Sequence, residues 1–218
     1  NYSRLLEELR KGSDVCAILH HSQERERFVV YSKPIIVTPS YHLYVSGKGV
    51  KRFQEQTGWI GGETSFEDIM SKSAGFKIAI TPGQSYGSER DAILARHADK
   101  AEVVKGFAGQ DTLVKMLVAN RMDMMLGFPW VINYEMNLLG IGTELIKVPL
   151  NDVPRYEASY AGCADTPLGR AAIDAIDNIS PPVHERVKDL LPRWLTDEES
   201  RSYYDVYREY FLEGKPLP

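Results

Sequence analysis

Short apolar runs alternate with stretches of helical periodicity between residues 77 and 148, and this alternation constrains the fold more than any other feature of the sequence. It predicts strands at 77–80, 102–104, 123–126 and 144–148, separated by helices at 85–96, 110–119 and 129–138. Strands that alternate with helices of roughly ten residues are typical of βαβ units, whose crossover helices cover a parallel sheet. We therefore expect a small, doubly wound α/β lobe over residues 46–152.

The chain on either side predicts a second lobe, made of residues 1–45 and 153–218. Residues before Gly12 have helical spacing, and glycine tolerates the positive φ that ends many helices. Residues 14–19 are apolar without a helical period, which predicts a strand buried on both faces. A strand at 156–163 and helices at 166–179, 183–191 and 196–212 complete the lobe, the last opening with the capping box Thr196-x-x-Glu199.

Two further segments lie between these elements. Residues 34–45 are rich in Ile, Val, Thr and Tyr but contain Pro34 and Pro39, which cannot donate to a strand ladder. We interpret this segment as an extended connector between the lobes. The motif Thr64-x-x-Glu67 reads as a capping box and predicts a helix of about two turns from that point.

Composition excludes several classes of protein. The 26 basic and 30 acidic side chains are mixed along the chain and give a net charge of −4, so the basic stripe of a nucleic-acid-binding protein is missing. No apolar run reaches the roughly 18 residues that a membrane-spanning helix needs. Because the chain begins with Asn1 instead of Met, we expect that an upstream segment, with a signal peptide as part of it, has been removed or left out.

Residues 83–87, Gly-Gln-Ser-Tyr-Gly, match the Gly-x-Ser-x-Gly nucleophile elbow of serine hydrolases. A triad on Ser85 would need Asp123 or Asp152 together with His184. Thr81 and Pro82 separate the predicted strand from the first glycine, whereas an elbow strand runs directly into its turn. We therefore favour Ser85 as the N-cap of a helix whose exposed N–H groups bind an anionic or polar ligand.

Two further candidates lie near the amino end. His20 ends the predicted strand at 14–19, where α/β lobes bind ligands, although an exposed histidine is an equal alternative. No third ligand stands near His20 and His21 at metal spacing, so we expect no metal or cofactor. Arg25 lies in a charged stretch and, considered alone, reads as a solvated loop cation.

The order of the motifs supports a ligand-binding role for Arg25. Three motifs follow one another at fixed spacing: Gly12-x-Asp14, Ser22-Gln23-Glu24-Arg25 and Tyr31-Ser32-x-Pro34. Together they resemble the type II periplasmic solute-binding proteins of the amino-acid class, extracellular solute-binding protein family 3. The turn Gly83-Gln84-Ser85 and the stretch Asn120-Arg121-Met122-Asp123 continue the resemblance, which covers most of the chain.

This resemblance implies two α/β lobes joined by a two-stranded hinge, near residues 34–45 and 151–157, that clamp a ligand for delivery to a membrane permease of the ABC type. Arg25 then matches the arginine that grips a ligand carboxylate by a bidentate contact. Further ligand contacts are implied for Ile18, His20, Gln84, Ser85 and Tyr86.

The chain departs from the family pattern at Phe128. The family places there the carboxylate that neutralises a ligand ammonium, and a desolvated ammonium without a counter-charge is costly. We therefore expect an organic anion with an apolar or aromatic body, packed against Phe128 and Trp130.

The second departure is at the amino end, where roughly the first two strands of the family's first lobe are missing. Either the chain is a fragment of a longer one, or a separate segment supplies those strands. We expect the protein to be a monomer unless another chain supplies them. The resemblance also implies that Cys16 and Cys163 lie at the same end of neighbouring antiparallel strands, where they can form a disulfide. Two buried thiols remain the alternative.

The prediction is thus a non-enzymatic, periplasmic or otherwise extracytoplasmic solute-binding protein with a small carboxylate ligand. Three alternatives stay open: a serine hydrolase using Ser85, a dehydratase or lytic enzyme on the same fold, and a ligand-sensing input domain of a receptor.

Overall fold

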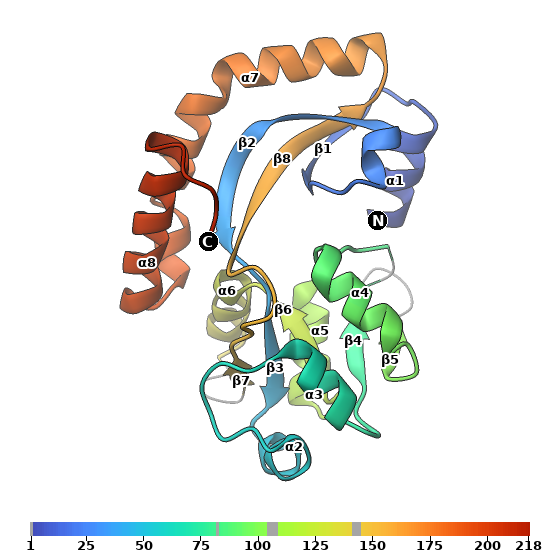
Figure 1. Cartoon of the computed structure of the whole chain (residues 1–218), viewed down its shortest axis with the longest axis vertical. Helices are drawn as coiled ribbons and strands as arrows, with labels where there is room; N and C mark the ends of the chain where they lie inside the picture. The colour runs from blue at the N-terminus through green and yellow to red at the C-terminus, as the bar shows by residue number, and fades with distance from the viewer. Residues whose placement is uncertain (1, 82, 104–108, 141–144) are drawn as a thin grey trace. The chain divides into compact units, whose positions relative to one another are not determined.

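The structure, a computed structural model, describes residues 2–81, 83–103, 109–140 and 145–218 (Figure 1). Its internal contacts divide the chain into two compact units. Unit 1 consists of Asn1–Pro39 and Tyr156–Pro218, and unit 2 consists of Ser40–Arg155. The chain therefore passes between the units twice. The two passing segments are hydrogen-bonded neighbours: Pro39 lies opposite Tyr156, and the Ser40 N–H donates to the Arg155 carbonyl at 2.8 Å.

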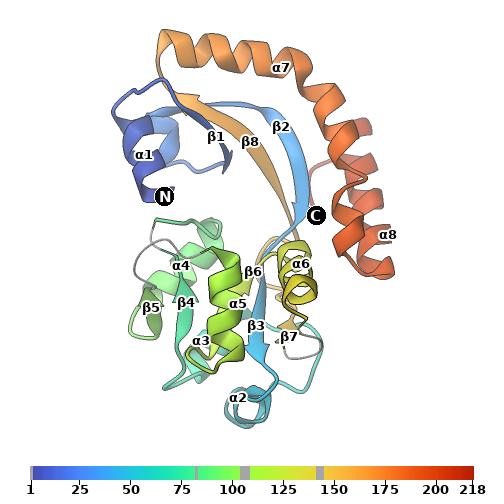
Figure 2. The same ribbon diagram turned by 180° about the vertical axis from the view of Figure 1, so that it is seen from behind.

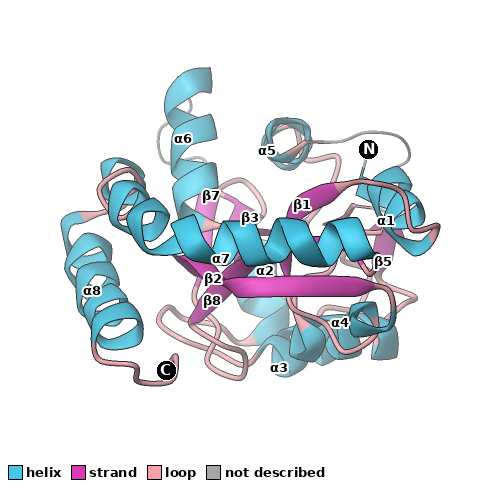
Figure 3. Ribbon diagram, turned by 90° about the horizontal axis from the view of Figure 1, so that it is seen from above, coloured by secondary structure: helices cyan, strands magenta, loops and turns pink. Residues whose placement is uncertain are grey.

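Unit 1 is built on a three-stranded antiparallel sheet in the order β1-β8-β2. Its strands are β1 (Cys16–His20), β2 (Val29–Pro39) and β8 (Tyr156–Ala164), and its helices are α1 (Tyr2–Arg10), α7 (Pro167–Val187) and α8 (Asp197–Tyr207). Short helical turns lie at Arg25–Arg27, Leu191–Trp194 and Arg208–Leu212. One face of the sheet packs on α1 through Leu6 and Leu9, and the other packs on α7 through Ile173. Figure 3 shows α7 running across the sheet, seen from above.

The prediction that the first strand is buried on both faces is wrong. Within the described residues β1 pairs only with β8, so it is an edge strand, and Ile18 is 54% exposed. Only Leu19 of its side chains is buried, against α1. An apolar run therefore indicated a strand here, but not how many neighbours the strand has.

The segment predicted as a connector forms two strands, one in each unit. Its first part belongs to β2, where the register shifts on both sides of Pro34, as expected for a residue without an N–H. The Ser32 hydroxyl accepts the Ala161 N–H at 3.0 Å beside this irregularity. Its second part, from residue 42 on, is β3 (His42–Ser46) of unit 2, so residues 40–45 lie in unit 2 and not in the first lobe.

Unit 2 contains a five-stranded mixed sheet in the order β5-β4-β6-β3-β7. Parallel pairing joins β5 (Ala101–Val103), β4 (Ile78–Ile80) and β6 (Met124–Gly127), whereas β3 is antiparallel to β6 and to β7 (Leu145–Val148). The helices are α2 (Val50–Thr57), α3 (Phe66–Lys72), α4 (Ser88–Arg96), α5 (Gln110–Val118) and α6 (Pro129–Leu139). The predicted α/β class is confirmed.

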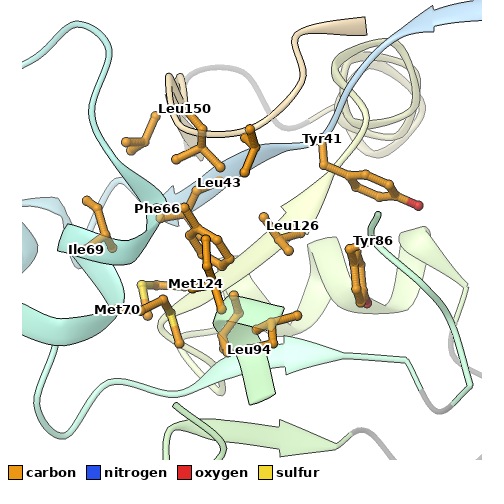
Figure 4. Close-up of a cluster of buried hydrophobic side chains, with 14 of the residues drawn as sticks. Tyr41, Leu43, Phe66, Ile69, Met70, Tyr86, Leu94, Met124, Leu126 and Leu150 are labelled. Atoms are coloured by element: carbon orange, nitrogen blue, oxygen red, sulfur yellow. The ribbon is translucent and has the colours of Figure 1, made fainter. Parts of the chain in front are cut away.

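Two apolar layers cover this sheet. On one face α3 and α4 pack through residues such as Phe66 and Leu94, in front of the sheet in Figure 1. On the other, α5 and α6 pack through Leu117 and Ile132, in front in Figure 2. Figure 4 shows the first cluster, with Tyr41 and Tyr86 at the side away from Ile69 and Met70. These aromatic residues lie where the core meets the strand ends.

Three predicted helix limits need correction. Ser65, not Thr64, caps α3 by accepting the Asp68 N–H, because Thr64 pairs with Leu150 instead. Helix α4 begins at Ser88, after Gly87 with φ 96°, so Ser85 is not its N-cap. Helix α7 is continuous to Val187, where two helices were expected, whereas the capping box of Thr196 and Glu199 on α8 is confirmed. No helix in the described part of the chain is long and apolar enough to cross a membrane.

Candidate functional site

Arg25 is the most unusual charged residue of unit 1. It opens a single turn of 3-10 helix after β1 and is 6% exposed. Its Nη1 donates to the His20 carbonyl at 3.3 Å, and its guanidinium lies 5.7 Å from the centre of the Tyr2 ring. Among the described residues no carboxylate forms an ion pair with it. A guanidinium has five N–H donors, and this one has no carboxylate partner among the described residues, so it can donate to an anion.

The surroundings of Arg25 are polar and aromatic. Tyr31 packs against His21 and Tyr160, with ring centres 4.9 and 6.0 Å away. Burial raises the pKa of the Tyr31 hydroxyl, and the positive charge of Arg25 opposes this change. The predicted site residue His20 has its Nδ1 3.3 Å from Oε2 of Glu157 on β8. Unit 1 therefore places Arg25 and His20 together, whereas Ile18 is exposed on the edge strand.

Cys16 and Cys163 form a disulfide in the structure, with Cα atoms 4.1 Å apart. They lie opposite each other in the register of β1 and β8. The bond links the strand that leads to Arg25 with the central strand of the sheet, so it restrains the backbone on which Arg25 depends.

In unit 2 the loop from Gly83 to Gly87 is held by the first turn of α4. The Asp91 carboxylate accepts the Ser85 hydroxyl at 2.6 Å and the Tyr86 N–H at 2.9 Å. Arg90, which is fully buried, donates to the Tyr86 carbonyl at 3.0 Å. The Tyr86 hydroxyl accepts the Thr81 N–H at 3.0 Å, and burial raises the pKa of this hydroxyl. Hydrogen bonds with Asp91, Arg90 and Thr81 thus hold this loop.

Arg90 also connects this loop to the passages between the units. Its Nη2 donates to the Ser40 hydroxyl at 2.5 Å and to the Pro154 carbonyl at 3.0 Å. Both acceptors lie where the chain enters or leaves unit 2. Sequence reasoning missed Arg90 because arginine on a predicted helix normally faces solvent, and no motif marks it.

Aromatic contacts bring the 83–87 loop to the end of β6. The Gln84 amide donates to the Tyr41 hydroxyl at 2.8 Å, and the Tyr41 ring lies 3.8 Å from the Phe128 ring. Phe128 in turn stacks with Trp130 at 6.0 Å. The predicted residues Gln84, Phe128 and Trp130 therefore form one connected cluster. Tyr41, which joins them, was missed because it lies in the segment interpreted as a connector.

The residues proposed for a serine-hydrolase triad have other partners. Ser85 donates to Asp91, whereas Asp152 accepts the N–H groups of Phe66 and Glu67. The Asp123 carboxylate accepts the Lys77 N–H at 2.7 Å, and Nδ1 of His184 lies 2.6 Å from the Tyr207 hydroxyl. In the part of the chain that the structure covers, no group of three His, Cys, Asp or Glu could hold a metal ion.

The two α/β units, with their sheets and the two passages that join them, define a periplasmic-binding-protein-like fold. No protein-family model and no curated protein matches the sequence. Solved structures do match: a histidine kinase sensor domain with similarity to periplasmic binding proteins aligns at 11% identity over 88% of this chain and 75% of its own, with a TM-score of 0.62.

Two more structures show the same fold. The periplasmic VFT2 domain of BvgS from Bordetella pertussis aligns at 16% identity over 88% of this chain and 72% of its own, with a TM-score of 0.57. A structure from work on glutathione import via GshT and the cystine ABC importer TcyBC of Streptococcus mutans aligns at 14% identity over 100% of this chain and 77% of its own, with a TM-score of 0.56.

Proposed function

We propose that this chain is an extracytoplasmic ligand-binding protein that captures a small carboxylate-bearing molecule. The observation that carries this proposal is Arg25, a buried guanidinium without a carboxylate partner among the described residues. A planar guanidinium suits a carboxylate because it can donate two parallel hydrogen bonds. Ile18 and His20 would be further contacts from unit 1.

Further candidate contacts lie in unit 2. Gln84, Ser85 and Tyr86 lie in the loop that Asp91 and Arg90 hold in place. Phe128 and Trp130 offer an aromatic wall where an amino-acid-binding site would need a carboxylate. The ligand in this proposal is therefore an organic acid with an apolar or aromatic body and no ammonium group.

Two observations support an extracytoplasmic location. Disulfides persist in oxidising compartments, and this chain has one between Cys16 and Cys163. The periplasmic VFT2 domain of BvgS and a histidine kinase sensor domain similar to periplasmic binding proteins share the fold. Delivery to an ABC-type permease is the role that follows from the solute-binding resemblance. A ligand-sensing input domain is the second candidate, favoured by the sensor domains among the structural matches.

Isothermal titration of the whole chain with a set of acids tests the proposal. The set contains benzoate, 4-hydroxybenzoate, succinate and the zwitterion phenylalanine. We expect at least one of the acids to bind, and Arg25→Gln to weaken that binding about 30-fold or more, because removing one partner of a buried charge pair costs roughly 2–5 kcal/mol. Phenylalanine should bind more weakly than the acids, because Phe128 stands where a carboxylate would neutralise its ammonium group.

Arg27→Gln is the matched control, since Arg27 is exposed and only two residues away. Circular dichroism of each variant establishes that it is folded. Absence of binding by every acid, equal effects of the two substitutions, or tight binding of phenylalanine would each contradict the proposal.

A further inference from the structure

The buried polar atoms of unit 2 that lack a hydrogen-bond partner among the described residues include Nε1 of Trp130 and Oε1 of Gln110. Native proteins pair nearly all such atoms, and an unpaired one costs free energy because it has lost its hydrogen bonds to water. Other side chains of the same types in unit 2 are paired: Trp59 Nε1 donates to the Gly62 carbonyl at 3.0 Å, and Gln56 Nε2 donates to the Ala74 carbonyl. The unpaired atoms therefore need an explanation of their own.

Both atoms belong to residues that adjoin the end of β6. Trp130 is the second residue of α6, which follows β6 after Phe128, and its ring stacks on the Phe128 ring. Gln110 is the first residue of α5, and its Oε1 would lie 3.3 Å from a Cβ placed on Gly127, the last residue of β6. The same Cβ would lie 2.7 Å from the Ile132 side chain, so glycine at 127 leaves room for both Ile132 and the Gln110 amide. In open α/β sheets, ligands bind beyond the carboxyl ends of the parallel strands.

The two atoms are chemically complementary. The indole nitrogen carries a donor and needs an acceptor, whereas the amide oxygen is an acceptor and needs a donor. A hydroxyl or a primary amide supplies both. A second carboxylate, ionised at neutral pH, would satisfy the indole but offer nothing to the amide oxygen.

We propose that Gln110 and Trp130 are specificity-determining residues that bind a hydroxyl or primary amide on the ligand's apolar body. This proposal rests on the proposed function and narrows its ligand class, from organic acids in general to acids with a neutral polar group remote from the carboxylate. Discrimination of this kind is strong because a ligand without the polar group leaves both protein atoms unpaired.

Titration of the whole chain with 4-hydroxybenzoate and with benzoate tests the inference, since the two probes differ only in the hydroxyl. The wild-type protein should bind 4-hydroxybenzoate about 10-fold more tightly than benzoate, as expected for two neutral hydrogen bonds. Trp130→Phe removes the indole N–H and keeps an aromatic ring, and Gln110→Met removes the amide at similar length. Each should reduce the preference for the hydroxyl to about 3-fold or less and change benzoate affinity little.

Trp59→Phe and Gln56→Met are the controls, because the Trp59 indole nitrogen and the Gln56 amide nitrogen already donate to carbonyls of the protein. They should leave the 10-fold preference unchanged. Equal affinity of the two probes for the wild-type protein, or an unchanged preference in Trp130→Phe, would overturn the inference while leaving the proposed function intact. If neither these probes nor any other acid binds, the proposed function itself fails. Should Gln110→Met not fold, the Trp130→Phe result decides.

Discussion

The two units each contain a buried arginine, and the two arginines differ in their hydrogen-bond partners. Arg90 is 0% exposed and donates to acceptors on three separate segments, including the Tyr86, Tyr41 and Pro154 carbonyls. Arg25 is nearly as buried, but within the described residues it donates to one carbonyl and lies over one aromatic ring. An arginine has five N–H donors. Those of Arg90 join three segments of unit 2, whereas Arg25 donates to fewer described partners.

Replacing Arg90 should therefore destabilise the protein. Arg90→Met leaves several buried carbonyls without a donor, and we expect the free energy of unfolding to fall by roughly 2–4 kcal/mol. Urea unfolding followed by circular dichroism measures the change. Arg121→Met, at an exposed position of the same unit, should change stability by less than about 0.5 kcal/mol. Similar losses for both variants would show that the Arg90 contacts contribute little.

At the scale of single elements, the start of helix α3 is stabilised by a local cap and by a residue distant in the sequence. Ser65 caps the helix from within, but Asp152, far along the chain, accepts the N–H groups of Phe66 and Glu67 and the hydroxyl of Ser65. Burial alone would raise the pKa of the Asp152 carboxyl, but these hydrogen bonds outweigh it and hold the pKa below its ordinary value. The helix start therefore depends on an ionised side chain.

The stabilisation by Asp152 should depend on pH in a defined direction. A carboxyl whose pKa is lower in the folded state stabilises the protein above its unfolded-state pKa, near 3.8, and loses this effect as the pH falls through the folded-state value. We expect Asp152→Ala to be less stable than wild type by about 1 kcal/mol at neutral pH, a typical loss when alanine replaces a side chain that caps a helix start. This difference should shrink in urea unfolding below about pH 4. A difference that stays constant in acid would contradict the assignment.

For the molecule as a whole, the disulfide spans most of the sequence. Cys16 and Cys163 are 147 residues apart, and the loop they close includes all of unit 2. Cross-linking so long a loop reduces the entropy of the unfolded chain, which stabilises the folded state by up to about 5 kcal/mol in the chain-entropy model. The sheet of unit 1 has only three described strands, and the disulfide adds a covalent restraint to it.

Reduction should accordingly lower the thermal stability of the protein. We expect a loss of roughly 2–5 kcal/mol in the free energy of unfolding when the wild-type chain is unfolded in the presence of dithiothreitol. The double variant Cys16→Ala and Cys163→Ala should show the lower stability with and without reductant. A thiol titration of the denatured wild-type chain before reduction provides a direct check, since finding two free thiols would rule out the bond.

The sequence by itself determined which segments form strands and helices over much of the chain, because hydrophobic periodicity reports the faces that each element buries. It also contains the motif order around Arg25. It did not determine that β1 is an edge strand, that Ser65 rather than Thr64 caps α3, or that residues 42–46 form a strand of the second sheet. These features depend on partners far away in the chain.

The candidate site likewise depends in part on residues that are far apart in the chain. Arg25, Gln84, Ser85 and Tyr86 stand in recognisable motifs, so the sequence can point to them. The burial of Arg25, the role of Tyr41 between Gln84 and Phe128, and the unpaired atoms of Gln110 and Trp130 exist only in the folded chain. Burial and pairing are properties of a side chain's neighbours in space, and only tertiary structure decides which neighbours those are.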